Sequence, residues 1–393
     1  MVKVLHVVPL ARRAGLQVMF INYLKELKKI NPAALNSHIV FAINFKEDLI
    51  DEIEHLGVKC YKSNRAFKLD FRVLLQMKRI IRENGISIIY GQNSTGSFWG
   101  WLAHLLTAKE TKLLCHEHGT AWSSNKPLIR LVTKLWLKKA DCTIANSYAT
   151  KTLLERKFCA NAKNIQVVYN GVPESKRNKD VIKRKMQLLF VGRLDDVKSP
   201  MTIIEAVHIL WKRKLKVAVI FLGDGPLLEV LKSRVHELGL HDMVQFKGSV
   251  GSDEVVDYMA ASSYLILPSI RESLGNVIIE AAMQNTATIA TKVDGIPEVI
   301  RGKEYGRLIT PTICISKKEF PGYSVDPETF TLTQPKKISP IDLANVISEE
   351  LLGNHFVEKG IRAGRTIPKR HKMSSYVMSI NAIYDALMNG SFS

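Results

Sequence analysis

The chain has 393 residues, of which 46% are hydrophobic and 24% charged, so it is too long for one ordinary core and two domains are expected. Its longest apolar runs, residues 4–10 and 97–106, are much shorter than the roughly 18 residues that span a bilayer, which predicts no transmembrane helix. Five scattered cysteines without a CxxC pair are typical of free thiols in a reducing cytoplasm, rather than a disulfide framework or a zinc site. They are Cys60, Cys115, Cys142, Cys159 and Cys314.

The formal net charge of +19 is concentrated in the first half of the chain. Residues 1–180 contain 29 Lys and Arg against 14 Asp and Glu, a net charge of +15, whereas the rest contains 27 against 23. Such an excess predicts an anionic partner, for which nucleic acid, an anionic membrane surface and a phosphorylated acceptor all qualify. The N-terminal apolar run follows a single Lys3, lacks a small-residue cleavage site and precedes Arg12 and Arg13, so no secretory signal is expected.

Buried strands and amphipathic helices alternate through the first half of the chain. We expect strands at residues 2–9, 38–43, 58–61, 87–90, 111–116, 141–147 and 164–171, and helices at residues 16–27, 47–56, 71–84 and 98–106. The repeated alternation predicts one Rossmann-like domain over residues 1–172.

A polar, charged stretch at residues 173–185 predicts an exposed linker, after which the alternation starts again. We expect strands at residues 187–192, 216–223, 244–248, 265–267 and 288–291, and helices at residues 201–213, 226–238, 252–261 and 277–283. A second Rossmann-like domain is therefore predicted over residues 186–370. Within it, the proline-containing segment 311–340 has no clear period and is interpreted as a long loop or small insertion.

The last part of the chain is predicted to be helical. One helix is expected from residue 341 to 352 and another from 376 to 388. The final segment, 371–393, is expected to pack back on the N-terminal domain.

The stretch 265–300 contains two carboxylates, Glu272 and Glu280, eight residues apart. The sequence predicts a strand, a loop that carries Glu272, and a helix that holds Glu280 about one turn from its start. Free N–H groups and the positive end of the helix dipole form an anion site at such a point. Both carboxylates can face one polyhydroxylated, phosphorylated ligand.

Two cations, Arg193 and Lys198, follow the first strand of the second domain, where ligands of doubly wound sheets bind. An Arg fork and a Lys point charge suit a diphosphate, although surface cations on a loop would give the same pattern. The Gly-x-Gly at residues 223–225 is weak evidence alone, because it occurs more often as a tight turn than as a nucleotide cradle.

A His-x-His pair, His116 and His118, follows a strand of the first domain. It is compatible with a metal ligand pair, with structural histidines, or with polar residues at an interdomain ligand cleft. No further ligand cluster is visible in the sequence, so no metal is expected.

Two segments of the first domain combine cations with apolar residues at helical spacing, at residues 68–82 and 128–139. Either can be a membrane-surface or acceptor-binding face, or simply a solvated face. The cations of the first segment are Lys68, Arg72, Lys78, Arg79 and Arg82.

In their order these motifs resemble the retaining glycosyltransferases of family 4, the glycosyl transferases group 1, over nearly all of residues 2–309. The matching features are Gly15, His118, YNGV at 169–172, VGRL at 191–194 with Lys198, GDGPL at 223–227, PSIRESLGNVIIE at 268–280 and DGIPE at 294–298. The pattern departs from the family at the end of the helix that contains Glu280, where Asn285 replaces a common glycine. The resemblance implies a GT-B fold, with two Rossmann-like doubly wound α/β domains facing a central cleft.

The resemblance also implies roles for individual residues. Arg193 and Lys198 would hold the donor diphosphate, Glu272 the sugar hydroxyls and Glu280 the ribose hydroxyls. Gly15 would let the first loop approach the diphosphate closely, and His118 would line the sugar pocket. The expected catalytic residues are Arg193, Lys198, Glu272 and His118, and the expected donor-binding residues are Gly15, Gly223, Leu274, Gly275, Asn276, Val277 and Glu280.

The implied activity is transfer of a hexose or N-acetylhexosamine from a nucleotide-diphosphate sugar, UDP being preferred to GDP, to a lipid-linked or surface-polysaccharide acceptor such as capsule or lipopolysaccharide. No metal and no further cofactor are expected. The basic N-terminal domain predicts a cytoplasmic enzyme that is peripheral on the inner face of the membrane. Two alternatives are a GT-B sugar-nucleotide epimerase or phosphorylase, because fold does not fix function, and a basic nucleic-acid-binding protein.

Overall fold

The computed structural model divides the chain into two compact units. The N-terminal unit comprises residues 1–173 and 372–393, and the C-terminal unit comprises residues 174–371. The structure describes residues 2–64, 70–107, 110–119, 122, 126–174 and 184–391. Most of the predicted linker 173–185, and Lys68 of the first basic segment, lie outside the described residues.

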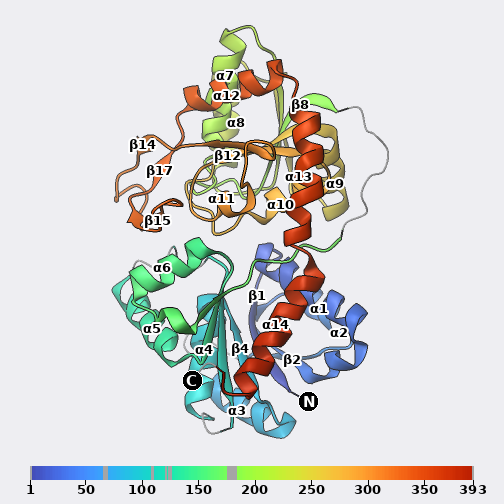
Figure 1. The fold of residues 1–393 in the computed structure, drawn as a ribbon, viewed down its shortest axis with the longest axis vertical. Helices are drawn as coiled ribbons and strands as arrows, with labels where there is room; N and C mark the ends of the chain where they lie inside the picture. Colours follow the sequence, from blue (N-terminus) through green and yellow to red (C-terminus); the bar gives the residue numbers. More distant parts are fainter. Residues whose placement is uncertain are drawn as a thin grey trace. The chain divides into compact units, whose positions relative to one another are not determined.

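The N-terminal unit is built on a seven-stranded sheet in the order β3-β2-β1-β4-β5-β6-β7, with every pair parallel. Its strands are β1 (Val4–Leu10), β2 (His38–Phe45), β3 (Lys59–Lys62), β4 (Ile88–Gln92), β5 (Lys112–Glu117), β6 (Cys142–Ala145) and β7 (Ile165–Val167). Its α-helices are α1 (Gly15–Ile30), α2 (Glu47–Glu54), α3 (Arg72–Asn84), α4 (Asn93–Leu105), α5 (Pro127–Lys139), α6 (Tyr148–Phe158) and α14 (Met373–Met388). Helices flank the sheet in Figure 1, as a parallel sheet with two apolar faces requires.

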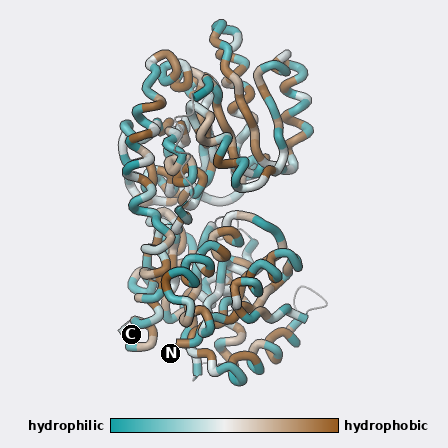
Figure 2. The backbone as a smooth tube through the Cα atoms, turned by 90° about the vertical axis from the view of Figure 1, so that its right-hand side faces the viewer, coloured by the Kyte–Doolittle hydropathy of each residue, from teal (hydrophilic) through white to brown (hydrophobic). Residues whose placement is uncertain are grey.

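The C-terminal unit is built on a six-stranded parallel sheet in the order β10-β9-β8-β11-β12-β13. Its strands are β8 (Lys185–Val191), β9 (Ala218–Leu222), β10 (Val244–Gly248), β11 (Ser262–Leu267), β12 (Ala287–Thr291) and β13 (Gly306–Ile309). Its helices are α7 (Pro200–Lys212), α8 (Leu228–Glu237), α9 (Ser252–Ala261), α10 (Asn276–Met283), α11 (Ile296–Val299), α12 (Pro340–Leu352) and α13 (Phe356–Arg370). Figure 2 shows hydrophobic stretches along the strands of both sheets.

Each unit has its own hydrophobic core. In the N-terminal unit the core includes Tyr376, Val377 and Ile380 of the C-terminal helix α14, which packs on α1 and sets Tyr376 against Tyr23. The chain enters this helix beside Gly171, where an added Cβ would lie 2.8 Å from the backbone of Met373. The last helix is therefore part of the N-terminal unit, although 198 residues of the other unit precede it.

The two parallel α/β sheets confirm the predicted pair of Rossmann-like domains. Four of the α-helices and sheet strands in the described residues were not expected from the sequence: the helices α6, α11 and α13, and the edge strand β13. The segment 311–340 also differs from a plain loop, because it forms two antiparallel pairs. These pairs join β14 (Ile313–Cys314) with β17 (Lys336–Lys337), and β15 (Ser324–Val325) with β16 (Leu332–Thr333).

Three buried histidines, His6, His38 and His116, and the half-buried His118 lie in the N-terminal unit among tyrosines of α1, β4 and α14. His6 Nε2 lies 2.7 Å from His38 Nδ1, and the rings of His116 and His118 have their centroids 3.7 Å apart. Burial lowers the pKa of His38 to about 4 and that of His118 to about 3, and it holds the pKa values of His6 and His116 well below the usual range. All four are neutral at physiological pH.

We expect acid to destabilise the N-terminal unit. The unfolded chain protonates these histidines near pH 6.5 but the folded unit does not, so the unfolded state binds more protons as the pH falls. Each such histidine lowers the free energy of unfolding by about 1.4 kcal/mol per pH unit between pH 6.5 and its folded pKa. Hydrogen exchange at pH 7.5 and pH 5, corrected for intrinsic rates, measures this loss of protection. Unchanged protection of β1, β2 and β5 at pH 5 would contradict it.

Candidate active site

The order of strands reverses between β8 and β11 in the C-terminal unit and between β1 and β4 in the N-terminal unit. In open parallel sheets, ligands bind outside the carboxyl ends of the strands at such a switch point. In the C-terminal unit the loops at this point are residues 192–199, after β8, and residues 268–275, after β11. They carry Arg193, Lys198 and Glu272.

Glycines hold the loop 192–199 against the loop that follows β9. A Cβ on Gly223 would lie 2.0 Å from the carbonyl oxygen of Gly192, and one on Gly225 would lie 2.4 Å from that of Leu194. The Leu194 N–H donates to the Asp224 carbonyl at 3.0 Å. Gly223 therefore has a structural role. The absence of a side chain lets its backbone pack against Gly192, and this contact fixes the loop that carries Arg193 and Lys198.

The structure brings Lys198 and Glu272 together. Lys198 Nζ donates to Glu272 Oε2, and the side chains retain only 23% and 13% of their accessible surface. Ser269 Oγ also reaches Glu272 Oε2, at 3.4 Å. An ammonium has three N–H donors, so Lys198 can keep this partner and still bind an oxyanion.

Arg193 is more exposed than Lys198 and lies beside Asp195, with its Nε 3.6 Å from Asp195 Oδ2. Asp195 also accepts the backbone N–H of Lys198 at 3.1 Å. One carboxylate that sequence analysis did not single out therefore orders both cations of the loop. Its signal in the sequence was its place between them, three residues before Lys198.

The loop 268–275 ends at Gly275, which has φ +90° and begins helix α10. Residues with a Cβ rarely adopt this conformation, and the glycine turns the chain so that the helix N-terminus follows directly. Leu274 is fully buried, whereas Asn276 and Val277 are half-buried in the first turn. The N-terminus of α10 thus begins four residues after Glu272, the partner of Lys198. A helix N-terminus with a cation in the neighbouring loop is typical of an anion site.

Glu280 lies about one turn inside α10 and is half-buried. Burial raises the pKa of its carboxyl group. Among the described residues the structure records neither a hydrogen bond nor an ion pair for it. A half-buried carboxylate without a protein partner is a natural acceptor for ligand hydroxyls.

Asp294 is a buried residue of this site, to which the sequence analysis gave no role beyond its place in the DGIPE motif at 294–298. Its Oδ2 accepts the N–H of Glu272 at 2.9 Å, and its Oδ1 accepts the N–H of Val325 at 2.6 Å. Burial raises its pKa, although both backbone donors act in the opposite direction. The adjacent Gly295 donates to the carbonyl of Glu272 at 3.1 Å, so the backbone of Glu272 is fixed on both sides.

The N-terminal unit contains the other two predicted residues. His118 follows β5, its Nε2 lies 2.9 Å from Gln92 Oε1, and its backbone N–H donates to Asn93 Oδ1 at 3.0 Å. Its lowered pKa makes it a neutral hydrogen-bonding group. Gly15 is the first residue of α1, and a Cβ built on it would meet no atom within 4 Å. The space above Gly15 is open, as close approach of a ligand would need.

Comparison with protein families matches both halves of the chain. The model described as Glycosyltransferase Family 4 matches residues 15–176, and the model described as Glycosyl transferases group 1 matches residues 172–317. The chain belongs to the family 4 glycosyltransferases. It is therefore an enzyme of the transferase class, as the motifs predicted.

Relatives and solved structures agree with this family. The chain is 28% identical over 253 residues to an uncharacterized glycosyltransferase of Methanocaldococcus jannaschii, covering 60% of this chain and only 61% of that relative. It is 20% identical over 314 residues to the capsular polysaccharide biosynthesis glycosyltransferase CapH of Staphylococcus aureus, covering 76% and 84%. The crystal structure of Anabaena HepE in complex with UDP and glucose superposes with a TM-score of 0.79 at 18% identity, covering 98% of this chain and 100% of HepE. This likeness shows that the fold is GT-B.

Two searches of the described residues bear on other predictions. No group of three or more His, Cys, Asp or Glu side chains in them is arranged to hold a metal ion. In the same part of the chain, no helix has both the length and the apolar character that crossing a membrane demands.

Gly223→Ala is expected to disrupt the loop that carries Arg193 and Lys198. The new Cβ would overlap the Gly192 carbonyl, and φ is +126° at this position, so we expect a loss of at least about 2 kcal/mol in the free energy of unfolding. Urea denaturation measures this loss, and calorimetry with UDP measures nucleotide binding.

Gly251→Ala is the matched control, because its Cβ would meet nothing within 4 Å and its φ is −67°. It should cost less than about 1 kcal/mol as a change at a helix N-cap. Equal stability of the two variants would show that the loops do not depend on the contact at Gly223.

Proposed function

We propose that this glycosyltransferase is a retaining enzyme that moves a hexose or N-acetylhexosamine from a UDP-sugar to a lipid-linked or surface-polysaccharide acceptor. The observation that carries the proposal is the Lys198–Glu272 ion pair beside the N-terminus of α10. HepE, which has the same fold, was crystallised with UDP and glucose, and CapH acts in capsular polysaccharide biosynthesis. These relatives support the donor and acceptor classes.

The leaving group sets the main electrostatic demand on the site. As the bond between the anomeric carbon and the phosphate oxygen breaks, the nucleoside diphosphate gains negative charge. Lys198, Arg193 and the positive end of α10 are the groups that would stabilise this charge. A cation about 4 Å away contributes up to roughly 4 kcal/mol at an effective dielectric constant near 20. We therefore propose that the reaction needs no metal.

Retention follows if the acceptor attacks from the face that the diphosphate leaves. The acceptor oxygen then bonds to the anomeric carbon, and the proton of its hydroxyl passes to the departing phosphate oxygen. Such a step needs no protein nucleophile. Glu272 is then a ligand for the donor's sugar hydroxyls, Glu280 a ligand for the ribose hydroxyls, and the neutral His118 a hydrogen-bonding group for the sugar.

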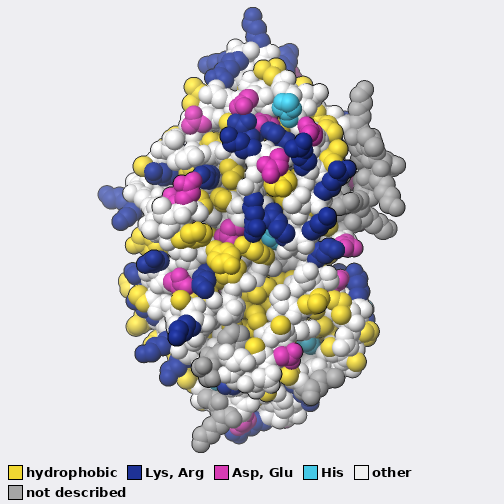
Figure 3. Space-filling model, viewed as in Figure 1, with side chains coloured by type: hydrophobic (Ala, Val, Ile, Leu, Met, Phe, Trp, Pro, Cys, Tyr) yellow, Lys and Arg dark blue, Asp and Glu magenta, His cyan; other side chains and the backbone are white. Residues whose placement is uncertain are grey.

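We also propose that the N-terminal unit binds an anionic membrane surface through α5. Leu128 and Leu131 on this helix are 72% and 55% exposed. Arg130 lies between them and further lysines follow along the helix, of which Lys134 and Lys138 have no ion pair among the described residues. Figure 3 shows basic and hydrophobic side chains intermixed at the edge where α5 and α6 lie in Figure 1. Exposed leucines beside cations suit a surface of anionic lipid better than water alone.

The first basic segment, residues 68–82, is a weaker candidate. On α3 the guanidinium groups are paired, Arg72 with Asp70 at 2.6 Å and Arg79 with Glu83 at 2.6 Å. Their charge is thus partly neutralised within the unit. The contrast favours α5 as the contact with lipid.

Lys198→Ala and Glu272→Ala are each expected to reduce turnover about 100-fold to 1,000-fold, as removal of a group aimed at transition-state charge does. The assay follows transfer and hydrolysis with a panel of UDP- and GDP-sugars. Lys232→Ala and Glu229→Ala form the control, because they remove an exposed Lys–Glu pair of the same unit, 2.8 Å apart, that lies outside the proposed site and should not affect turnover. Turnover within twofold of the wild type in the first two variants would refute the site.

The double variant Leu128→Gln, Leu131→Gln is expected to weaken binding to anionic vesicles about tenfold or more. The variant loses the favourable free energy of transferring two leucine side chains from water into the lipid. Co-sedimentation with vesicles of anionic and of neutral lipid measures the bound fraction. Leu352→Gln on α12, in the C-terminal unit, is the control, since Leu352 is also a highly exposed leucine. Recovery of the wild type in the supernatant with both kinds of vesicle would overturn the proposal.

A further inference from the structure

The segment between β13 and α12 forms a small folded element in the C-terminal unit. Its first strand, β14, pairs with its last strand, β17, and the hairpin β15–β16 lies between them in the sequence. Asp326 closes the hairpin, because its Oδ1 accepts the N–H groups of Glu328 and Thr329 at 3.0 and 2.9 Å. The segment 310–337 is thus ordered by its own contacts, and neither the sequence pattern nor the family resemblance assigns it a task.

Apolar side chains of this segment pack on the two loops of the donor site. Ile315 and Phe320 form a buried cluster with Ile270 of the loop after β11, and Val197 of the loop after β8 packs against it. The Arg271 guanidinium lies over the Phe320 ring, 4.3 Å from its centroid. Val197 directly precedes Lys198 in the sequence, and Arg271 directly precedes Glu272.

Hydrogen bonds join the hairpin to the same loop through Asp294. The Val325 N–H donates to Asp294 Oδ1, and the Val325 carbonyl accepts the Asp294 N–H at 3.2 Å. The second carboxylate oxygen, Oδ2, accepts the N–H of Glu272. Ser324 Oγ adds a bond to the carbonyl of Ile270 at 3.3 Å. One buried carboxylate therefore connects the strand β15 to the backbone of Glu272.

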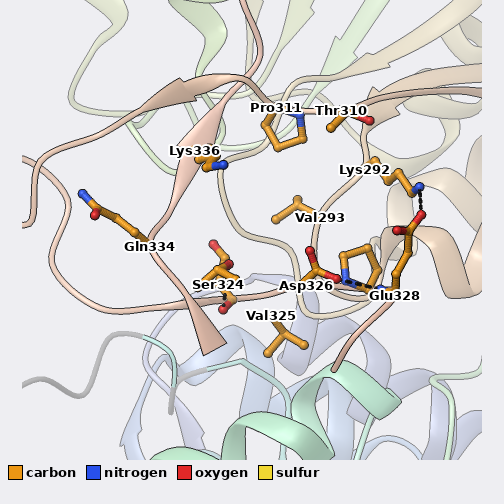
Figure 4. Close-up of a pocket in the computed structure, with 12 residues that line it drawn as sticks. Lys292, Val293, Thr310, Pro311, Ser324, Val325, Asp326, Glu328, Gln334 and Lys336 are labelled. Carbon is orange, nitrogen blue, oxygen red and sulfur yellow. Dashed lines mark hydrogen bonds and ion pairs between the residues drawn. The ribbon is translucent and has the colours of Figure 1, made fainter. Parts of the chain in front are cut away.

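A second attachment lies at the edge of a hollow of about 140 Å³, whose lining includes Lys292, Val325 and Glu328. Figure 4 shows Ser324 and Val325 of the hairpin beside Val293, and the ion pair of Lys292 with Glu328 at the edge of the hollow. The hairpin therefore contacts the chain after β12 at two points, through the hydrogen bonds of Asp294 and through this ion pair.

We propose that segment 310–337 is a supporting wall of the donor site, and that Asp294 is the positioning residue through which this wall holds Glu272 against Lys198. The inference rests on the proposed function, because it makes the wall a determinant of how the donor's sugar is bound. Glu272 is proposed to bind the sugar hydroxyls, whereas the ribose is proposed to be bound by Glu280. Loss of the wall should therefore weaken binding of the sugar more than binding of the nucleotide.

Three variants test the proposal. Asp294→Asn keeps the shape of the side chain and tolerates the left-handed φ of +47°, but offers only one acceptor oxygen. Phe320→Ala removes the apolar contact. Phe330→Ala is the matched control, since Phe330 lies in the hairpin turn, is 42% exposed and belongs to the same segment.

The first measurement is hydrogen exchange of the ligand-free protein over residues 269–275. We expect exchange about tenfold or more faster in Asp294→Asn and in Phe320→Ala, because a buried hydrogen bond to a charged group and a buried ring both oppose local opening. Phe330→Ala should exchange as the wild type does. Equal rates in all three variants would overturn the proposal, whatever the protein binds.

The second measurement compares the dissociation constants of UDP and UDP-glucose. For Asp294→Asn we expect affinity for UDP within about twofold of the wild type and affinity for UDP-glucose reduced about tenfold, as loss of a charge-assisted contact predicts. A merely structural defect would weaken both ligands alike and would contradict a positioning role. If the wild type binds neither ligand, the proposed donor is wrong, and the exchange rates still decide whether the wall holds the loop.

Discussion

The ion pair between Lys198 and Glu272 joins two loops of the C-terminal unit, and several other contacts of the unit serve to position it. Its two residues are 74 positions apart and lie on loops that follow different strands. A pair of long, charged side chains gains little from attraction alone when solvent reaches it, so its geometry has to be supplied by the backbone. Gly223 and Gly225 supply it on one side by close packing on the loop 192–199, and Asp294 supplies it on the other by binding the N–H of Glu272.

This arrangement also explains why the same loops contain charges of both signs. A site for a nucleotide sugar has to attract a diphosphate and to accept hydrogen bonds from hydroxyl groups. Under the proposed function, the cations and the α10 N-terminus would meet the first need, and Glu272 and Glu280 the second. The half-buried position of Glu280, with no partner among the described residues, is costly in an isolated protein and is what a hydroxyl ligand would satisfy.

The core of the N-terminal unit differs from this site, because its titratable groups are held neutral by burial. The buried histidines remain unprotonated at physiological pH, and the tyrosines of α14 pack among them. Closure of the core thus depends on a helix from the end of the chain, which reaches the sheet beside Gly171. The excess positive charge of this unit lies elsewhere, on exposed helices such as α5.

The sequence by itself determined the class of fold and the chemical type of the site. Continuous apolar runs and helical periods repeat locally, so they predicted two parallel α/β domains, and the spacing of Glu272 and Glu280 placed one in a loop and the other a turn inside a helix. Only the tertiary structure decided which groups hold them. Asp294 meets Glu272 across 22 residues and Ser324 of the hairpin meets Ile270 across 54 residues, and no local period records such contacts. Helix α13 escaped prediction for the same reason. Its glycines disfavour a helix when read locally, but Gly360 and Gly364 are required where the helix packs on Asn285.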